Sequence, residues 1–156
     1  ANFANVASLL QDGVEGVIAV DSTIKIMIHV ENAKSFPAVR NYVDQIRQRG
    51  VQFDVLGLSC YTLYQGQPAV WEDTFTQLAA AFPDISFAIA EYNPERVRAN
   101  QIMHELPDGR GLGTFFWEPT QSGAWGPSLF SFSGDAYTAN DKDFAEIDGL
   151  LPSLGL

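Results

Sequence analysis

The chain has 156 residues and a mass of 17.1 kDa, which is enough for one domain with a substantial hydrophobic core. Apolar residues make up 46% of it and charged residues 18%, which excludes the disordered, collagen-like and coiled-coil classes. Nine basic and nineteen acidic residues give a net charge of −10, which repels nucleic-acid backbones and anionic bilayers. We therefore expect no nucleic-acid partner and no membrane partner, and the charge favours neutral partners.

The sequence gives no sign of a bound metal or cofactor. The single cysteine, Cys60, has no partner for an internal disulfide and does not by itself form a structural zinc site. The glycine-rich run 108–113 precedes a predicted strand, whereas a nucleotide-binding loop follows a strand and opens a helix. No apolar run approaches the ~18 residues of a membrane span. The chain begins at Ala1 without a starting Met or a signal segment, so we expect it to be processed or cut from a longer chain.

Taken in chain order, the apolar residues predict helices and strands in alternation. Spacings of three and four predict a first amphipathic helix over 3–18, with a possible break near Gly13. The predicted strands and the helices that follow them are strand 24–30 and helix 39–46, strand 53–59 and helix 71–82, strand 85–91 and a helix that starts at Asn93-Pro94, and strand 112–117 and helix 144–151. Residues 119–139 are expected to form a long loop.

The strand ends lie about 26 to 32 residues apart, which is the size of one βα unit. The fold class is therefore parallel α/β, formed by a single unit over residues 1–156. Two architectures fit this pattern: an open doubly wound sheet, or an arc of a (β/α)₈ barrel, which normally needs about 250 residues. Periodicity alone does not distinguish them.

Polar and aromatic residues gather at the predicted carboxyl ends of the strands, where the active site of a barrel lies. They are His29, Ser59 with Tyr61, Glu91 with Tyr92, and Trp117 with Glu118.

Each of these residues also has a purely structural interpretation. His29 suits a hydrogen-bonded core histidine as well as a functional one. Glu91 is either a stabilising charge before the next helix or a carboxylate whose pKa is tuned by its apolar strand. Trp117 and Trp125 are either core aromatics or surfaces for the C–H faces of sugars. Cys60 is interpreted as inert packing.

Several of these segments together resemble one family. The runs 53–61 (FDVLGLSCY), 87–91 (FAIAE) and 113–119 (GTFFWEP) are similar to the strand 6, 7 and 8 signatures of glycoside hydrolase family 53, the endo-β-1,4-galactanases. Residues 27–30 (MIHV) resemble that family's strand 5, and residues 128–134 (SLFSFSG) resemble its C-terminal run. The resemblance covers nearly the whole chain but only the C-terminal half of the family's barrel. It implies a (β/α)₄ half-barrel that corresponds to strands 5–8 of a TIM barrel.

The resemblance also implies a retaining galactanase mechanism in which Glu91 is the nucleophile. Tyr61 would orient Glu91, and Trp117 would form the floor of the sugar subsite next to the cleaved bond. His29 and Glu118 would contact sugar or support other site residues. The family's acid/base Glu follows an Asn at the end of strand 4, and this chain has no counterpart of that motif. Residues 60–64 (CYTLY) also depart from the family's Tyr-Tyr-Pro-x-Trp, which puts substrate preference in doubt.

The resemblance implies a secreted protein, extracellular or periplasmic, that acts on plant cell-wall galactan without a cofactor. Because half a barrel leaves open edges and an apolar face, we expect a homodimer or a complementary half-barrel. In a two-copy barrel, Glu118 of the second copy would stand near the position of the missing acid/base, although a folded but inactive assembly is favoured over such a shared site. Two other readings stay open: a glycan-binding or assembly protein without turnover, and an unrelated open α/β enzyme.

Overall fold

The computed structural model describes residues 2–120 and 128–155 and contains one parallel sheet of four strands in the order β1-β2-β3-β4. The strands are β1 (Met27–Val30), β2 (Val55–Cys60), β3 (Ser86–Tyr92) and β4 (Gly111–Phe116). Each strand pairs in parallel with the next one along the chain, as successive βα units require. The predicted parallel α/β class is confirmed.

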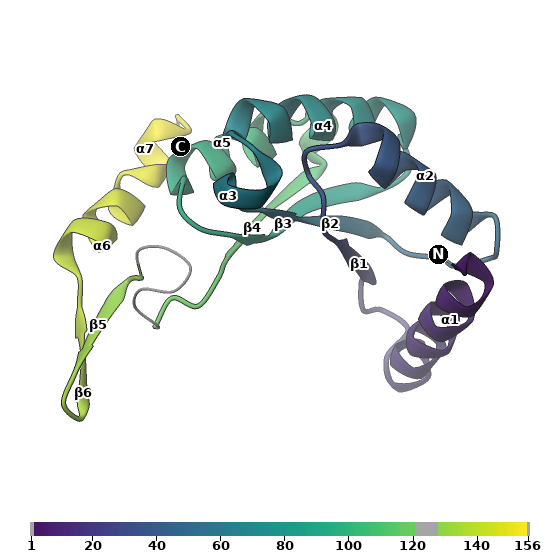
Figure 1. Cartoon of the computed structure of the whole chain (residues 1–156), viewed down its shortest axis with the longest axis horizontal. Helices are drawn as coiled ribbons and strands as arrows, with labels where there is room; N and C mark the ends of the chain where they lie inside the picture. Colours follow the sequence, from purple (N-terminus) through teal and green to yellow (C-terminus); the bar gives the residue numbers. More distant parts are fainter. Residues whose placement is uncertain (1, 121–127, 156) are drawn as a thin grey trace.

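The helices are α1 (Phe3–Val20), α2 (Phe36–Arg47), α3 (Thr62–Gln65), α4 (Pro68–Ala81) and α5 (Arg96–Glu105), followed after the 3₁₀ turn η1 (Pro107–Gly109) and β4 by α6 (Asp141–Asp148) and α7 (Leu150–Ser153). Helices α2, α4 and α5 lie on one side of the sheet, which curves beneath them as an arch (Figure 1). Helix α1 lies beyond the edge strand β1 and packs against α2. A doubly wound sheet would carry helices on both faces, so this arrangement is that of half a barrel.

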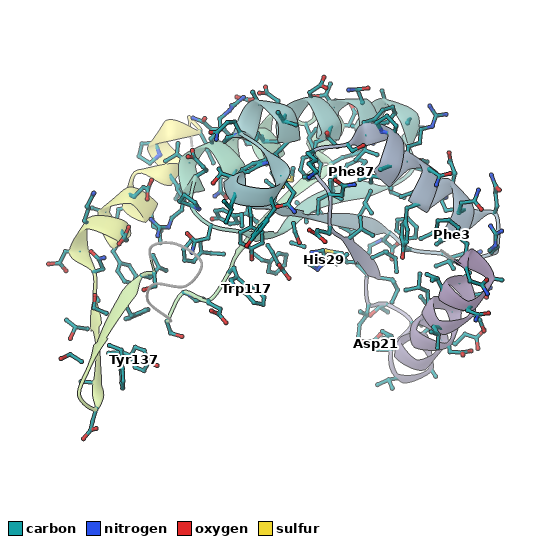
Figure 2. The ribbon with its side chains drawn as sticks, in the orientation of Figure 1. Phe3, Asp21, His29, Phe87, Trp117 and Tyr137 are labelled. Atoms are coloured by element: carbon teal, nitrogen blue, oxygen red, sulfur yellow. The ribbon has the colours of Figure 1, made fainter. Side chains whose placement is uncertain are left out.

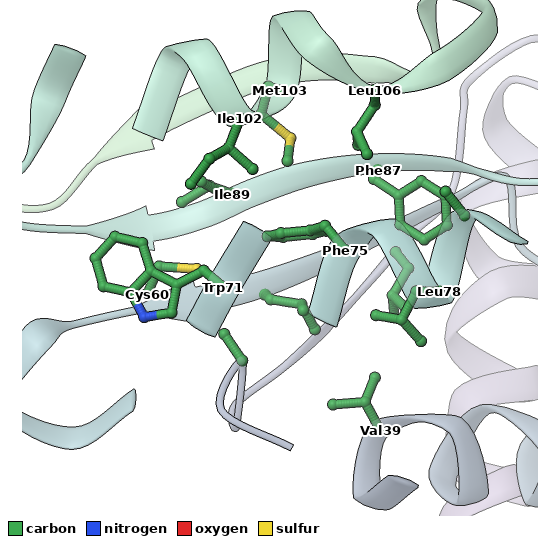
Figure 3. Packing of buried hydrophobic residues seen from close by; sticks show 14 of the residues in the cluster. Val39, Cys60, Trp71, Phe75, Leu78, Phe87, Ile89, Ile102, Met103 and Leu106 are labelled. Atoms are coloured by element: carbon green, nitrogen blue, oxygen red, sulfur yellow. The ribbon is translucent and has the colours of Figure 1, made fainter. Parts of the chain in front are cut away.

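The main core lies between the sheet and α2, α4 and α5 (Figure 3). The ring of Phe75 on α4 meets the ring of Phe87 on β3 edge-on, with centroids 6.2 Å apart. The buried Trp71 and Cys60 belong to this same core cluster, and burial raises the pKa of the Cys60 thiol, as expected for inert packing. A smaller cluster around Ala7, Ile28 and Ile46 joins α1 and α2 to β1.

The concave face of the sheet is left uncovered by the described residues. Met27 on β1, Phe115 on β4 and Trp117 just after β4 are 38%, 59% and 36% exposed, whereas Phe87 on the helix-covered face is fully buried. His29 and Trp117 both project below the sheet in Figure 2, and Phe87 lies on its other side. A closed barrel would bury this face in its interior.

Three local predictions are wrong. Helix α1 runs without a break through Gly13, from Phe3 to Val20. Helix α5 begins at Arg96, because Glu95 before it adopts a left-handed backbone conformation. Within the expected loop 119–139, the hairpin of β5 (Phe130–Ser133) and β6 (Ala136–Ala139) forms an antiparallel pair.

Candidate functional site

Strand pairing brings the predicted site residues His29 and Glu91, together with Ser59, to the same edge of the sheet. In the register, His29 on β1 lies opposite Gly57, and Ser59 on β2 lies opposite Glu91 on β3. The register shifts by one residue between Leu58 and Ser59. Such a bulge turns the side chains that follow it. Here it places Glu91 directly beside Ser59 at the carboxyl end of the strands.

Two hydroxyl groups hold one oxygen of the Glu91 carboxylate. Tyr61 Oη donates to Glu91 Oε2 at 3.2 Å, and Ser59 Oγ donates to the same oxygen at 3.4 Å. His29 Nε2 and Ser59 Oγ share a hydrogen bond of 2.8 Å, in which the imidazole tautomer decides the donor. The other ring nitrogen, Nδ1, lies 3.9 Å from Glu91 Oε1. Glu91 is therefore oriented through Oε2, and Oε1 faces the imidazole.

The pKa of Tyr61 is raised well above its ordinary value of 10.0. Burial is the largest cause, because it penalises the phenolate, and the charge and hydrogen bond of Glu91 add to it. The charge of Glu118 contributes a smaller part, so Glu118 acts electrostatically on this residue. Tyr61 consequently stays protonated at neutral pH and remains a hydrogen-bond donor to Glu91.

The Glu91 carboxylate opens into a pocket of about 330 Å³. Its lining comes from the ends of β1, β2 and β3 and from the turns that follow β1 and β2: His29, Glu31, Ser59, Tyr61, Tyr64, Gln65 and Glu91. Glu31, Tyr64 and Gln65 were not predicted as site residues. Glu31 and Tyr64 stand two and three residues beyond the predicted site residues His29 and Tyr61, a signal that could have found them, whereas the buried Gln65 gives no such signal.

Trp117, Glu118 and Trp125 are placed differently from the pocket residues. Trp117 lies on the concave side of the sheet, and neither it nor Glu118 is among the described residues that line the pocket. Glu118 adopts a left-handed backbone conformation, with φ 47°. Trp125 lies outside the described residues.

A larger pocket of about 600 Å³ lies at the opposite, amino ends of the strands. Its charged groups already pair with one another: Lys25 Nζ donates to Asp54 at 3.2 Å, and Arg47 binds Asp84 through both guanidinium nitrogens. These pairs tie together the loops at this end of the sheet. The carboxylates of Glu31 and Glu91 line the smaller pocket, and this pocket is the candidate site despite its smaller volume.

The family model for glycosyl hydrolase family 53 matches residues 1–100 of the sequence. The chain belongs to this family. A 30% identical relative is an uncharacterized protein in the bgaB 5′ region of Niallia circulans, with 81% of this chain and 42% of the relative aligned. A probable arabinogalactan endo-β-1,4-galactanase A of Neosartorya fischeri is 28% identical over 81% of this chain and 46% of its own length. The chain thus spans a little under half the length of these curated relatives.

Solved family 53 structures share the fold. The GH53 catalytic domain of Ignisphaera aggregans superposes with a TM-score of 0.70 at 21% identity, covering 77% of this chain and 42% of that domain. A structure from a study of two fungal β-1,4-galactanases gives a TM-score of 0.69 at 22% identity, covering 84% of this chain and 51% of the other. The predicted half of a TIM barrel is confirmed.

Among the described residues, no helix is long and apolar enough to cross a membrane. The same residues contain no group of three or more His, Cys, Asp or Glu side chains arranged to hold a metal ion.

Proposed function

We propose that this chain is the half of a retaining β-1,4-galactanase barrel that carries the nucleophile. The observation behind this proposal is Glu91, a carboxylate at the end of β3 that is held through one oxygen by two hydroxyl donors inside a pocket. A carboxylate oriented in this way leaves Oε1 to attack the anomeric carbon and form a glycosyl ester. Tyr61 and Ser59 then stabilise Oε2 while the ester forms and breaks.

The other proposed site residues bind sugar around this carboxylate. Trp117 offers an exposed ring on the concave face, which suits the C–H surface of a galactosyl unit. His29 orients Ser59 and contacts sugar from the β1 side. Glu118 and Trp125 are proposed as further sugar contacts. β-1,4-Galactan is the proposed substrate because relatives that share this chain's family carry galactanase in their names, and secretion follows from a polymeric substrate.

Retaining hydrolysis needs a second carboxyl group about 5 to 5.5 Å from the first, to protonate the leaving oxygen. We propose that the half that completes the barrel supplies it, and we call this assembly the completed barrel. The open edges of β1 and β4 and the uncovered concave face favour such an assembly. The second half is either another segment of the same protein or a second copy of the unit formed by residues 1–156.

In the two-copy arrangement, a two-fold axis places β4 of the second copy where a full barrel has its strand 4. Glu118 of that copy would then face Glu91 across the cleft. A structure of the dimer tests this arrangement directly. Carboxyl oxygens more than about 10 Å apart lie beyond the retaining and inverting ranges and would exclude a shared site.

Covalent trapping of the nucleophile tests the proposed function. A 2-deoxy-2-fluoro-galactoside with a good leaving group slows both steps and accumulates the glycosyl ester. We expect the label on the peptide that contains Glu91 in the completed barrel, and no label in Glu91→Gln. Glu15→Gln, on the exposed surface of α1, is the control and should label normally.

Galactan turnover by Glu91→Gln should fall by several orders of magnitude while the fold stays intact, because an amide cannot form the ester. Retention of more than about a tenth of the activity would reject the assignment. A completed barrel that binds β-1,4-galactan in calorimetry but releases no reducing sugar would instead support a glycan-binding protein.

A further inference from the structure

The buried side chain of Gln65 links the turn after β2 to the end of β1. Its Oε1 accepts the backbone N–H of Tyr61 at 3.0 Å, and its Nε2 donates to Glu31 Oε1 at 3.0 Å. Its backbone N–H also bonds the carbonyl of Tyr61 at 2.7 Å, and its carbonyl accepts Trp71 Nε1–H at 3.0 Å. Gln65 is only 2% exposed, so both ends of its amide are used inside the protein.

This position needs one acceptor and one donor on the same side chain. The acceptor faces a backbone N–H of Tyr61, and the donor faces the carboxylate of Glu31. A methionine of similar length would satisfy neither partner, and an asparagine would be one methylene too short to reach both. The amide thereby fixes the distance between Tyr61, which holds Glu91, and Glu31.

Glu31 is the pocket's second carboxylate and was not among the predicted site residues. It is exposed, lines the same pocket as Glu91, and has one oxygen held by Gln65. A carboxylate accepts hydrogen bonds only, so the remaining lone pairs suit ligand hydroxyl groups. The turn that follows is anchored too, since Lys34 Nζ donates to the carbonyl of Tyr64 at 3.0 Å.

We propose that Glu31 binds the hydroxyl groups of a glycosyl unit next to Glu91. Gln65 is the positioning residue that fixes Glu31 and Tyr61 relative to each other. This inference rests on the proposed function and adds a sugar-binding carboxylate to it. Loss of Glu31 weakens substrate binding. Loss of the Gln65 amide weakens binding through Glu31 and slows turnover through Tyr61.

Steady-state kinetics of the completed barrel on β-1,4-galactotetraose test the inference. For Glu31→Ala we expect KM to rise about tenfold, the effect of losing a hydrogen bond to a charged group, with kcat within about threefold of wild type. For Gln65→Met we expect a similar rise in KM together with a lower kcat. Glu15→Ala on α1 is the matched control and should change neither constant.

The double variant separates positioning from general structural damage. If Gln65 acts on binding through Glu31, the two substitutions share one effect, and Glu31→Ala/Gln65→Met should raise KM little more than either alone. Gln65→Asn gives a second, milder test if Gln65→Met does not fold.

If the wild type is active but Glu31→Ala leaves KM unchanged, this inference is overturned and the proposed function stands. The same holds if the KM increases of Glu31→Ala and Gln65→Met multiply in the double variant. A folded, completed barrel without any galactan binding or hydrolysis would overturn both.

Discussion

Replacing Gly57 by alanine should disturb the site through packing alone. A Cβ at position 57 would lie 2.8 Å from the Cβ of Ala90 and 2.9 Å from Met27 Sδ. The Met27 side chain can rotate away, but the Ala90 Cβ is fixed to the backbone of β3, directly before Glu91. Restoring an ordinary contact of 3.4 Å requires β2 and β3 to separate by about 0.6 Å at this point.

That displacement exceeds the ~0.5 Å within which a catalytic group must be held, and a 1 Å misplacement costs about 10²-fold. We therefore expect Gly57→Ala to lower kcat of the completed barrel on β-1,4-galactan by roughly 10- to 100-fold. Overpacking of this kind lowers the free energy of unfolding by about 1 to 3 kcal/mol. Both quantities are measured on one preparation, by reducing-sugar release and by urea unfolding.

Gly13→Ala is the matched control, because a Cβ there meets nothing within 4 Å and the residue lies inside helix α1. It should raise the free energy of unfolding by about 0.5 to 1 kcal/mol and leave kcat unchanged. If Gly57→Ala turns galactan over within about threefold of wild type, β2 and β3 do not transmit the clash to Glu91, and the reasoning fails.

Two further predictions use the pKa shifts. In Glu91→Gln the pKa of Tyr61 should fall but stay above 10.0, because burial, the largest cause of its elevation, remains. Near-ultraviolet titration, with Tyr61→Phe as the reference, measures this pKa. An unchanged pKa would mean that the charge of Glu91 does not act on the Tyr61 hydroxyl. The Ile26 N–H bond holds the pKa of Asp54 below 3.8, so this stabilisation is present at neutral pH and lost as the pH falls below about 4. Asp54→Asn should lower the free energy of unfolding at pH 7 by only about 0.5 kcal/mol, because the Asp54 side chain is 40% exposed and solvent screens its charge. The acid dependence of unfolding in urea titrations should flatten, and an unflattened profile would assign the acid sensitivity elsewhere.

Much of the architecture follows from the sequence alone. Runs such as 53–59 and 85–91 are apolar at nearly every position, which predicts strands buried in a parallel sheet. Their regular spacing predicts βα units, and a parallel sheet brings all its carboxyl ends to one edge. His29, Tyr61 and Glu91 could therefore be expected near one another, because this depends only on strand order and direction.

The contacts between these residues needed the tertiary structure. The register shift after Leu58, which sets Glu91 beside Ser59, results from pairing between strands and leaves no periodic signal in either strand. Gln65 reaches Glu31 across 34 positions of sequence only because β1 and β2 lie side by side. Local periodicity records which face of an element is buried, whereas hydrogen bonds between elements depend on how those elements are packed. Local sequence patterns thus predict the parallel α/β class and the edge of the sheet where the candidate site lies, whereas strand pairing sets which oxygen of Glu91 is held and which carboxylate shares its pocket.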